Sequence, residues 1–417
     1  MLSVLSRSFS RSSKNSLGNR SVLIVGAGVA GPVLAYFLHR YGVHPVVVER
    51  TPQLRTTGQT VDVRGAGREV VRRMGVNSVI REKITREDGL ALVDSAGRTQ
   101  AAFGVKDFGG QGFIADIEIL RGELVNILYE QSRNHTQYIF GDHPSSINDQ
   151  GDHVQVTFAS GNIRDFDLVI GADGIRSKTR RLLFSDKSPI HYLNMYTAYF
   201  TIPYSQSDGT WARWYNAPKG RTVLIRPDNQ GTTRAFLTFR SSQRGYEELD
   251  PDMQKELLQK VFADAGFETP RVLNGLMNSN DFYFEAIGQV KMDQWSRGRV
   301  TLVGDAGYCA SPVSGMGTTL AFVGAYILAG EIGRHHDHTE AFRQYEALMR
   351  PYVTKAQKLI PGSIHVASPQ TSTGIAFRNA LLSFVARPAV TRLLTKLTES
   401  KTAEKVTLPD YEIVLAQ

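Results

Sequence analysis

Three glycines near the N-terminus have a spacing that suits the binding of a phosphate-bridged dinucleotide. Gly26, Gly28 and Gly31 follow an apolar run at residues 22–25 and open a segment with helical apolar periodicity. The first glycine permits a tight turn, the second lets a pyrophosphate approach the backbone, and the third lets helix and strand pack closely. Amides at the helix N-terminus would face the phosphates. We therefore expect a dinucleotide site at this turn.

An acidic residue completes the pattern. The next apolar strand, predicted at residues 45–48, ends at Glu49. A carboxylate in that place can accept hydrogen bonds from both ribose hydroxyls. Strand, glycines, helix, strand and acid thus occur in the order of a dinucleotide-binding βαβ unit, and an ordinary βαβ unit is the alternative.

Two later segments place a glycine and an acid after an apolar run. The first, at residues 167–180, is DLVIGADGIRSKTR, and the second, at residues 301–325, is TLVGDAGYCASPVSGMGTTLAFVGA. Each alone could be an ordinary strand that ends in a turn. Between them, alternating apolar and aromatic residues predict antiparallel strands at about 194–203, 210–217, 221–226 and 233–240. An inserted sheet domain therefore interrupts the nucleotide-binding unit.

Composition excludes several other classes of protein. The single cysteine among 417 residues excludes an internal disulfide framework and a Cys-rich metal site. The net charge of +8 is spread over interspersed acids and bases, so we expect no nucleic-acid partner. The tract at residues 335–338, HHDH, is typical of a solvated helix end rather than a metal site, because adjacent residues point in different directions. We predict no metal.

The first twenty residues resemble a mitochondrial transit peptide. They contain four basic residues, seven serines and no acid, and their apolar and basic residues would lie on opposite faces of a helix. A disordered serine-rich tail is the alternative. We expect a mitochondrial protein, and otherwise a cytoplasmic one.

Residues 306–330 carry no Asp, Glu, Lys or Arg, and so could be weighed as a membrane span. The first half contains Pro312 and several glycines, and the apolar run that follows is too short to cross a bilayer. We predict a buried helix and no transmembrane segment. Two further helices are expected at about 339–358 and 375–398.

Taken together and in this order, the three motifs resemble those of flavoprotein monooxygenases of the para-hydroxybenzoate hydroxylase type. The resemblance is greatest to the small branch that includes tetracycline-inactivating and fungal or microbial tailoring monooxygenases, and it extends from residue 22 to about 411. It implies an α/β fold with a discontinuous Rossmann-like FAD-binding domain, an inserted antiparallel β-sheet substrate domain and C-terminal helices. The expected boundaries are 1–20 for the leader; 21–88, 116–186 and 288–365 for the FAD-binding domain; 89–115 and 187–287 for the substrate domain; and 366–417 for the C-terminal helices.

The resemblance also implies roles in FAD binding for particular residues. Gly26, Gly28 and Gly31 would hold the pyrophosphate, and Glu49 would bind the adenosine ribose. Further matches near the cofactor are two arginines, Arg50 and Arg121; the pair Asp173 and Gly174, which serves FAD and the passing NADPH, with Arg176 close by; Asp305, toward the ribityl chain; Gly315 and Gly317, beside the ring; and Asp62, near the flavin edge.

Some of these residues have plainer interpretations. Arg121 could be a surface residue at a helix end, and Asp62 could form a local ion pair with Arg64. Cys309 is expected to be a small buried residue and not a redox centre, because no partner cysteine exists.

The activity that the resemblance implies is hydroxylation of a small, aromatic or apolar organic substrate. Non-covalent FAD would take a hydride from NADPH or NADH, and O2 would reach the substrate by way of a flavin hydroperoxide. The catalytic residues of the substrate pocket are not identified. The predicted sheet carries aromatic residues that suit a flat ligand, among them Tyr199, Trp211, Trp214 and Phe236. Half of the aromatic residues must face away from such a ligand. An FAD-dependent dehydrogenase or reductase, or a flavoprotein acting on a protein partner, is the alternative.

Overall fold

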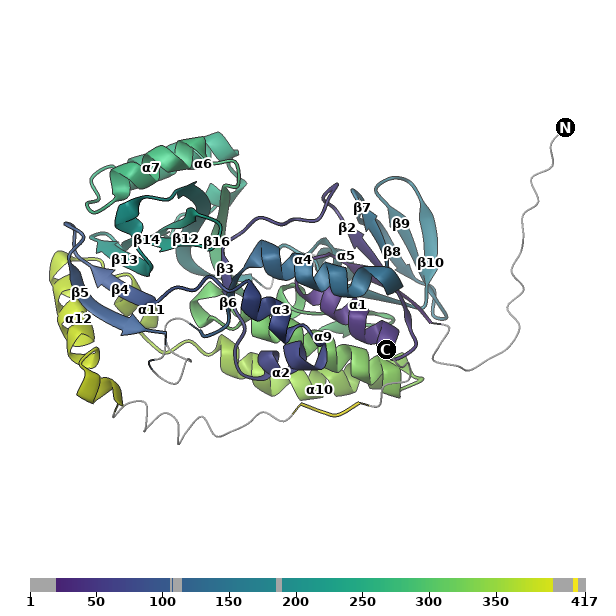
Figure 1. The fold of residues 1–417 in the computed structure, drawn as a ribbon. Helices are drawn as coiled ribbons and strands as arrows, with labels where there is room; N and C mark the ends of the chain where they lie inside the picture. Colours follow the sequence, from purple (N-terminus) through teal and green to yellow (C-terminus); the bar gives the residue numbers. More distant parts are fainter. Residues whose placement is uncertain (1–19, 106, 108–114, 185–189, 393–407, 412–417) are drawn as a thin grey trace.

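The computed structural model describes residues 20–105, 107, 115–184, 190–392 and 408–411. Figure 1 shows an α/β layer and, beside it, a large sheet that carries its own helices. The predicted leader lies outside the described residues except for its last residue, Arg20. Arg20 Nη1 donates a 3.1 Å hydrogen bond to the main-chain oxygen of His335, so it is part of the fold.

The α/β layer is built on a six-stranded sheet. Its first strand, β1 (Ser21–Val25), is an apolar run buried on both faces, as strands of parallel sheets usually are. Five strands are parallel and the edge strand β17 is antiparallel. The order across the sheet is β17 (Ser296–Arg297), β18 (Val300–Leu302), β11 (Leu168–Gly171), β1, β2 (His44–Glu49) and β7 (Gln137–Phe140).

Helices cover this sheet. The uncharged stretch forms the helix α9 (Gly317–Arg334), which is buried along most of its length and packs on α1 (Ala30–Arg40) and α10 (His338–Gln357). The prediction of a buried helix is thus correct, and no described helix is long and apolar enough to cross a membrane. The other elements of this part are α2 (Ala66–Arg73), α3 (Asn77–Glu82), α4 (Arg121–Ser132), α5 (Lys178–Phe184), α8 (Asp305–Tyr308), and the antiparallel strands β8 (Pro144–Asp149), β9 (Val154–Phe158) and β10 (Ile163–Phe166).

The second sheet has seven strands. In order they are β16 (Tyr283–Val290), β12 (Ile190–Pro203), β15 (Thr232–Arg240), β14 (Arg221–Pro227), β13 (Trp211–Ala217), β4 (Gly89–Val93) and β5 (Thr99–Gly104). All neighbours are antiparallel except β13 and β4. The helices α6 (Pro251–Phe262) and α7 (Thr269–Asn278) lie on one face, above the sheet in Figure 1. Asp250 caps α6, and Pro251 opens it, as expected from the sequence.

A two-stranded ribbon of β3 (Thr60–Asp62) and β6 (Glu118–Leu120) forms a further small sheet, besides the three-stranded sheet of β8, β9 and β10. After α10, the chain forms α11 (Ser363–Ala367) and α12 (Ser372–Val385), and α12 packs against β5 and β13. The helix predicted at 375–398 is interrupted after Val385, because the residue before Pro388 disfavours helical backbone, and the chain is helical again at residues 388–392. Residues 393–398 of that prediction lie outside the described residues.

Candidate functional site

Close backbone contacts explain two of the three glycines that follow β1. Gly26 has a φ of +112°, and a Cβ there would lie 2.7 Å from the main-chain oxygen of Ala172. A Cβ on Gly31 would lie 2.0 Å from the oxygen of Gly26. Gly28 differs, because its Cβ position meets only the Arg121 Nη2 atom, at 3.5 Å. A side chain at Gly28 would therefore not crowd the backbone and would instead cover the open side of the turn.

Glu49 lies at the end of β2 and holds the glycine turn. Its Oε2 accepts a 2.9 Å hydrogen bond from the Ala27 amide, and its Oε1 accepts bonds from the amide and hydroxyl of Thr51. The carboxylate is half-buried, so it can also meet a ligand over the turn. Arg50, the next residue, is exposed.

Arg121 is the first residue of α4, and its side chain runs between two glycine-bearing loops. Its Cδ lies 3.4 Å from the Cβ position of Gly58, and its Nη2 lies beside Gly28. Burial, and after it the nearby Arg55, lower the pKa of this guanidinium. Among the described residues it has no carboxylate in ion-pair contact. A buried cation without a partner is costly, and a phosphate at the glycine turn would compensate it.

Asp173 and Gly174 follow β11, next to β1. Asp173 accepts hydrogen bonds from the hydroxyl of Ser177, at 2.5 Å, and from the amide of Thr179, at 3.0 Å. It therefore holds the start of α5 rather than projecting freely. Gly174 has a φ of +80°, which favours glycine, and Arg176 is exposed.

Arg180 was not expected at the site. Its Nη1 donates to the main-chain oxygen of Ala306, at 2.8 Å, and its Nη2 to that of Ile175, at 2.6 Å. The side chain is buried. It thus joins the loop after β11 to the loop after β18. Arg180 belongs to the motif quoted at residues 167–180, but the sequence could not show which main-chain oxygens its guanidinium binds.

Asp305 follows β18 and opens α8. Its Oδ1 lies 4.0 Å from the Cβ position of Gly317, the first residue of α9. The side chain is exposed to solvent, yet it lies deep among protein atoms, and this desolvation raises the pKa of its carboxyl. Cys309 and Arg121 act in the opposite direction. The structure thus brings together Arg121, Asp305 and Gly317 from three separate segments.

The loop between α8 and α9 is strained at one residue. Ser311 has a φ of +72°, is buried, and its hydroxyl has no hydrogen-bond partner among the described residues. Such strain is common at functional sites. Gly315 also has a positive φ, +63°, which glycine adopts without cost. Cys309 is buried as expected, and burial raises the pKa of its thiol.

Asp62 forms the local ion pair that was the plainer interpretation. Its carboxylate accepts bonds from Arg64 Nε, at 2.9 Å, and Nη2, at 2.6 Å. The main chain of Arg64 is in turn bound to Thr319 in the first turn of α9. Asp62 therefore lies near the N-terminus of α9, with its charge already paired.

The aromatic residues of the large sheet lie on both of its faces. Tyr199, Phe236 and Trp214 lie in one row across the strands, together with Leu224. They point away from the core under α6 and α7, whereas Trp211 packs against that core. The row, here called the open face, therefore keeps three of the four predicted aromatics.

The open face ends at β16 in a pair that sequence reasoning missed. Tyr283 Oη donates a 3.0 Å hydrogen bond to Glu285, and the Tyr283 ring is stacked with that of Tyr199. Desolvation and, after it, the charge of Asp305 raise the pKa of Glu285 to about 6. The sequence predicts that Tyr283 and Glu285, two residues apart on a strand, share a face of the sheet. It could not show that Asp305 influences Glu285.

A buried charge cluster joins the sheet to the ribbon. Arg226 of β14 pairs with Glu87 at 2.7 Å and with Glu118 of β6 at 2.5 Å. Glu118 Oε2 has no partner, and desolvation raises the pKa of Glu118 to about 8. This cluster fixes β14 against the elements that carry Asp62.

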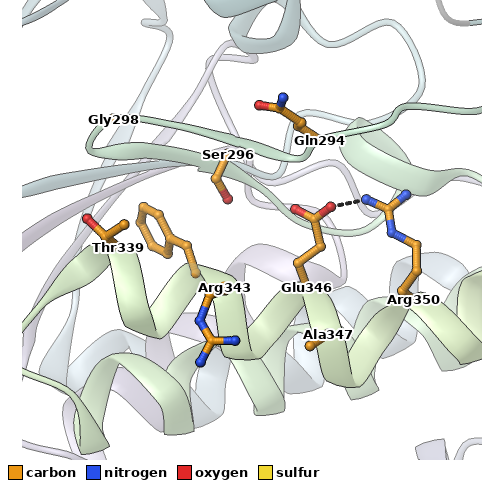
Figure 2. Close-up of a pocket in the computed structure, with 9 residues that line it drawn as sticks. Gln294, Ser296, Gly298, Thr339, Arg343, Glu346, Ala347 and Arg350 are labelled. Carbon is orange, nitrogen blue, oxygen red and sulfur yellow. Dashed lines mark hydrogen bonds and ion pairs between the residues drawn. The ribbon is translucent and has the colours of Figure 1, made fainter.

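Two other places prove unrelated to the site. Within the described part of the chain no three acids, histidines or cysteines could hold a metal, and Asp337 of the histidine tract caps α10. A pocket of about 450 Å³ lies between α10 and the chain near β17. Figure 2 shows its Glu346–Arg350 ion pair on α10, on elements that carry none of the residues above.

The arrangement fits a bound dinucleotide. A turn whose open side lacks a side chain, an unpaired arginine beside it and the exposed Asp305 carboxylate after β18, two strands away, match a pyrophosphate and a polyol chain. They also lie along the carboxyl edge of one parallel sheet, where such ligands bind.

Comparison with known proteins agrees with this geometry. The family model described as "FAD binding domain" matches residues 19–358. A flavin-dependent monooxygenase of Legionella longbeachae is 38% identical over 94% of this chain and 99% of its own length. The FAD-dependent monooxygenase asL6 of Sarocladium schorii is 35% identical over 94% of this chain and 97% of its own.

Solved structures show the same fold. The tetracycline destructase Tet(51) superposes with a TM-score of 0.78 at 32% identity, covering 94% of this chain and 100% of its own. Klebsiella pneumoniae HpxO, solved with FAD and uric acid, is similar in fold, with a TM-score of 0.73 at 20% identity. The match covers 91% of this chain and 97% of the HpxO chain. The chain therefore belongs to the FAD-binding-domain family and is a flavin-dependent monooxygenase of the para-hydroxybenzoate hydroxylase type.

Proposed function

We propose that this enzyme uses NAD(P)H and O2 to hydroxylate a small aromatic or apolar substrate held on the open face of the large sheet. The observation that supports the proposal is the packing of α8, which Asp305 opens, against β16, the strand that carries Glu285: the Val290 amide of β16 donates a 3.0 Å hydrogen bond to the main-chain oxygen of Cys309, directly after α8. This packing supports a position of the β16 end of the open face beside the residues suited to the dinucleotide. A substrate on that face would therefore meet the reactive end of the cofactor.

FAD, when bound, supplies the hydride acceptor and the oxygen-activating ring. Gly26 permits the tight turn, Gly28 leaves the open side of the turn free for the pyrophosphate, and Arg121 would pair with a phosphate oxygen. Glu49 accepts hydrogen bonds from the adenosine ribose, and Asp305 accepts them from the ribityl hydroxyls.

The N-terminus of α9 stabilises negative charge on the reduced cofactor. Gly315 and Gly317 let the backbone approach the ring, and the amides of the first turn face its carbonyl side. Asp62, paired with Arg64, lies at the ring edge. Asp173 and Gly174 serve the passing nicotinamide cofactor, and Arg50 stays at the adenosine end. The apolar open face excludes water from the reacting centre.

The test begins with the purified protein, which should be yellow and should release intact FAD on heating. NADPH or NADH oxidation should then rise when candidate aromatic compounds are added, with O2 consumed and one ¹⁸O atom from ¹⁸O2 found in the product. A colourless protein that fails to bind added FAD would overturn the proposal.

The same assay separates the alternatives. A dehydrogenase or reductase would oxidise or reduce its substrate without ¹⁸O in the product. A flavoprotein acting on a protein partner would show no stimulation by any small molecule.

We further propose mitochondrial import through the basic, acid-free leader. A reporter fused to residues 1–30 should reach mitochondria. A cytosolic reporter would favour a disordered tail and a cytoplasmic enzyme.

A further inference from the structure

One arginine under the C-terminal helix has no counter-charge. Arg378 of α12 is 7% exposed, and its guanidinium contacts two amide oxygens, those of Asn216 and Asn379. Its Nε is buried with no hydrogen-bond partner, and among the described residues no carboxylate pairs with it. Buried arginines are normally paired, because an isolated buried charge is costly.

A second unused donor lies beside it. The Arg378 guanidinium lies 5.7 Å from the ring centre of Trp214, and the Trp214 indole N–H is also buried, with no hydrogen-bond partner in the described part of the chain. Buried tryptophan N–H groups usually find an acceptor. Two neighbouring donors that both lack an acceptor indicate a site for an anionic group.

Both donors belong to the open face of the large sheet. Asn216 and Trp214 alternate on β13, and Trp214 lies in the row that continues through Phe236 to Tyr199. Figure 1 shows α12 beside β4 and β5, at one end of this sheet, whereas β16 and β12, the strand that carries Tyr199, lie toward the other end. Four strand spacings separate β13 from β16, or about 19 Å.

The covering segment adds no negative charge. Residues 347–398 contain no Asp or Glu. Burial lowers the pKa of Arg378 to about 10, which still leaves the guanidinium charged at neutral pH. An anion that reaches this place therefore meets a cation that no neighbouring acid neutralises.

We propose that Arg378, with the Trp214 indole N–H, binds a carboxylate or similarly acidic group of the substrate, at the end of the open face remote from the flavin. The proposal rests on the proposed function only in assigning the anion to the substrate. Arg378 lies several strands from Glu285, so it is a positioning residue that does not touch the reacting atoms. A substrate that reaches from Arg378 to the flavin end of the open face is an extended acid with several rings.

The stability of the ligand-free site tests the proposal without any substrate. Arg378→Met should lower the melting temperature of the holoenzyme clearly less than the matched control does, because the removal of an uncompensated buried charge offsets the loss of the hydrogen bond to Asn216. The matched control is Arg221→Met. Arg221 is also buried in this sheet, but it pairs with Asp264 and donates to the Val261 oxygen at 2.7 Å. Its loss should lower the melting temperature by about 3 °C or more.

Ligand preference tests the chemistry. Anthracene-2-carboxylate and its carboxamide differ in charge but hardly in shape, and anthracene fluorescence reports their binding to the holoenzyme. The acid should bind at least about tenfold more tightly than the amide. Arg378→Met should reduce this preference to about one, and Arg378→Lys should retain part of it.

The outcomes are distinct. A melting temperature that falls in Arg378→Met as far as in Arg221→Met would make Arg378 a structural residue and overturn the proposal. A parent enzyme without preference for the acid, or one that binds neither probe, would also overturn it. FAD content and NAD(P)H oxidation, measured on the same samples, report the proposed function separately.

Discussion

The Arg180 guanidinium joins the loops that follow two neighbouring parallel strands by donating a 2.8 Å hydrogen bond to the main-chain oxygen of Ala306. A second bond, 2.6 Å long, reaches the oxygen of Ile175. Asp305 directly precedes Ala306, and Asp173 lies two residues before Ile175. The relative position of these two acids therefore depends on one buried side chain.

Arg180→Met should lower the free energy of unfolding of the FAD-free protein by about 2–4 kcal/mol, because two buried carbonyl oxygens lose a charged donor. It should also weaken FAD binding, since the loop of Asp305 is no longer held. Chemical denaturation and FAD titration measure the two effects.

Arg181→Met is the matched control. Arg181 is exposed and binds only the main-chain oxygen of its neighbour Arg176, at 2.9 Å. This variant should match the parent in both measurements. If Arg180→Met behaved in the same way, the contact would have no role in holding the loops.

Two glycine substitutions should affect different properties, one the stability of the fold and the other the affinity for FAD. Gly31→Ala places a Cβ 2.0 Å from the Gly26 oxygen, so it should destabilise the fold by at least about 3 kcal/mol. Gly28→Ala meets only the movable end of Arg121, at 3.5 Å, so the protein should fold. Its methyl group nevertheless occupies the open side of the turn, and FAD affinity should fall about tenfold or more.

Thermal melts of the FAD-free proteins, with FAD titrations alongside, check this pair. A Gly28→Ala protein with unchanged FAD affinity would mean that the pyrophosphate lies elsewhere.

The sequence was sufficient for residues whose role depends on local chain order. Gly26, Gly31 and Glu49 lie in one βαβ unit, so their proximity follows from the order of the elements. Asp305 could be placed at a strand end for the same reason. These positions need only the rule that parallel strands present their carboxyl ends at one edge.

Residues that depend on long-range pairing could not be predicted. Trp211 and Trp214 both lie on β13, and only the partners of that strand decide which one faces α6 and α7. The strand that carries Glu285, β16, packs against α8, which Asp305 opens, and this contact between distant segments depends on how the large sheet lies on the α/β layer. Arg378 reaches Asn216 across 162 residues of sequence, so no local pattern could reveal it.

The pH dependence of stability should report Glu118. Desolvation raises its pKa to about 8, so the folded protein retains a proton that the unfolded chain loses near pH 4.5. Stability should therefore fall as the pH rises from about 4.5 to 8, by at most about 1.4 kcal/mol per pH unit. Glu118→Gln, which mimics the neutral acid, should flatten this slope in denaturation curves recorded from pH 5 to 8.

Glu256→Gln is the surface control, because Glu256 is 62% exposed on α6. It should leave the slope as in the parent. A slope that persists in Glu118→Gln would assign the extra proton to another buried group of the cluster.

The last prediction concerns Asp305. Its carboxylate emerges after β18, faces the Gly317 backbone, and is exposed although protein surrounds it. A carboxylate in this place can accept hydrogen bonds from the ribityl hydroxyls, each contributing about 1.5–3 kcal/mol. Asp305→Ala should therefore weaken FAD binding about 10- to 100-fold. The melting temperature of the FAD-free protein should not fall, because the desolvated charge that raises the Asp305 pKa is removed.

Asp337→Ala separates this role from that of an ordinary helix-end acid. Asp337 caps α10, accepting a 2.9 Å hydrogen bond from the Thr339 amide, and lies outside the cofactor site. Its loss should lower the melting temperature and leave FAD affinity unchanged, the reverse of the result for Asp305→Ala. Titration of both FAD-free variants with FAD, together with their melting curves, decides the matter. If Asp305→Ala gave the Asp337→Ala pattern, Asp305 would be a turn residue, and the ribityl chain would need another acceptor.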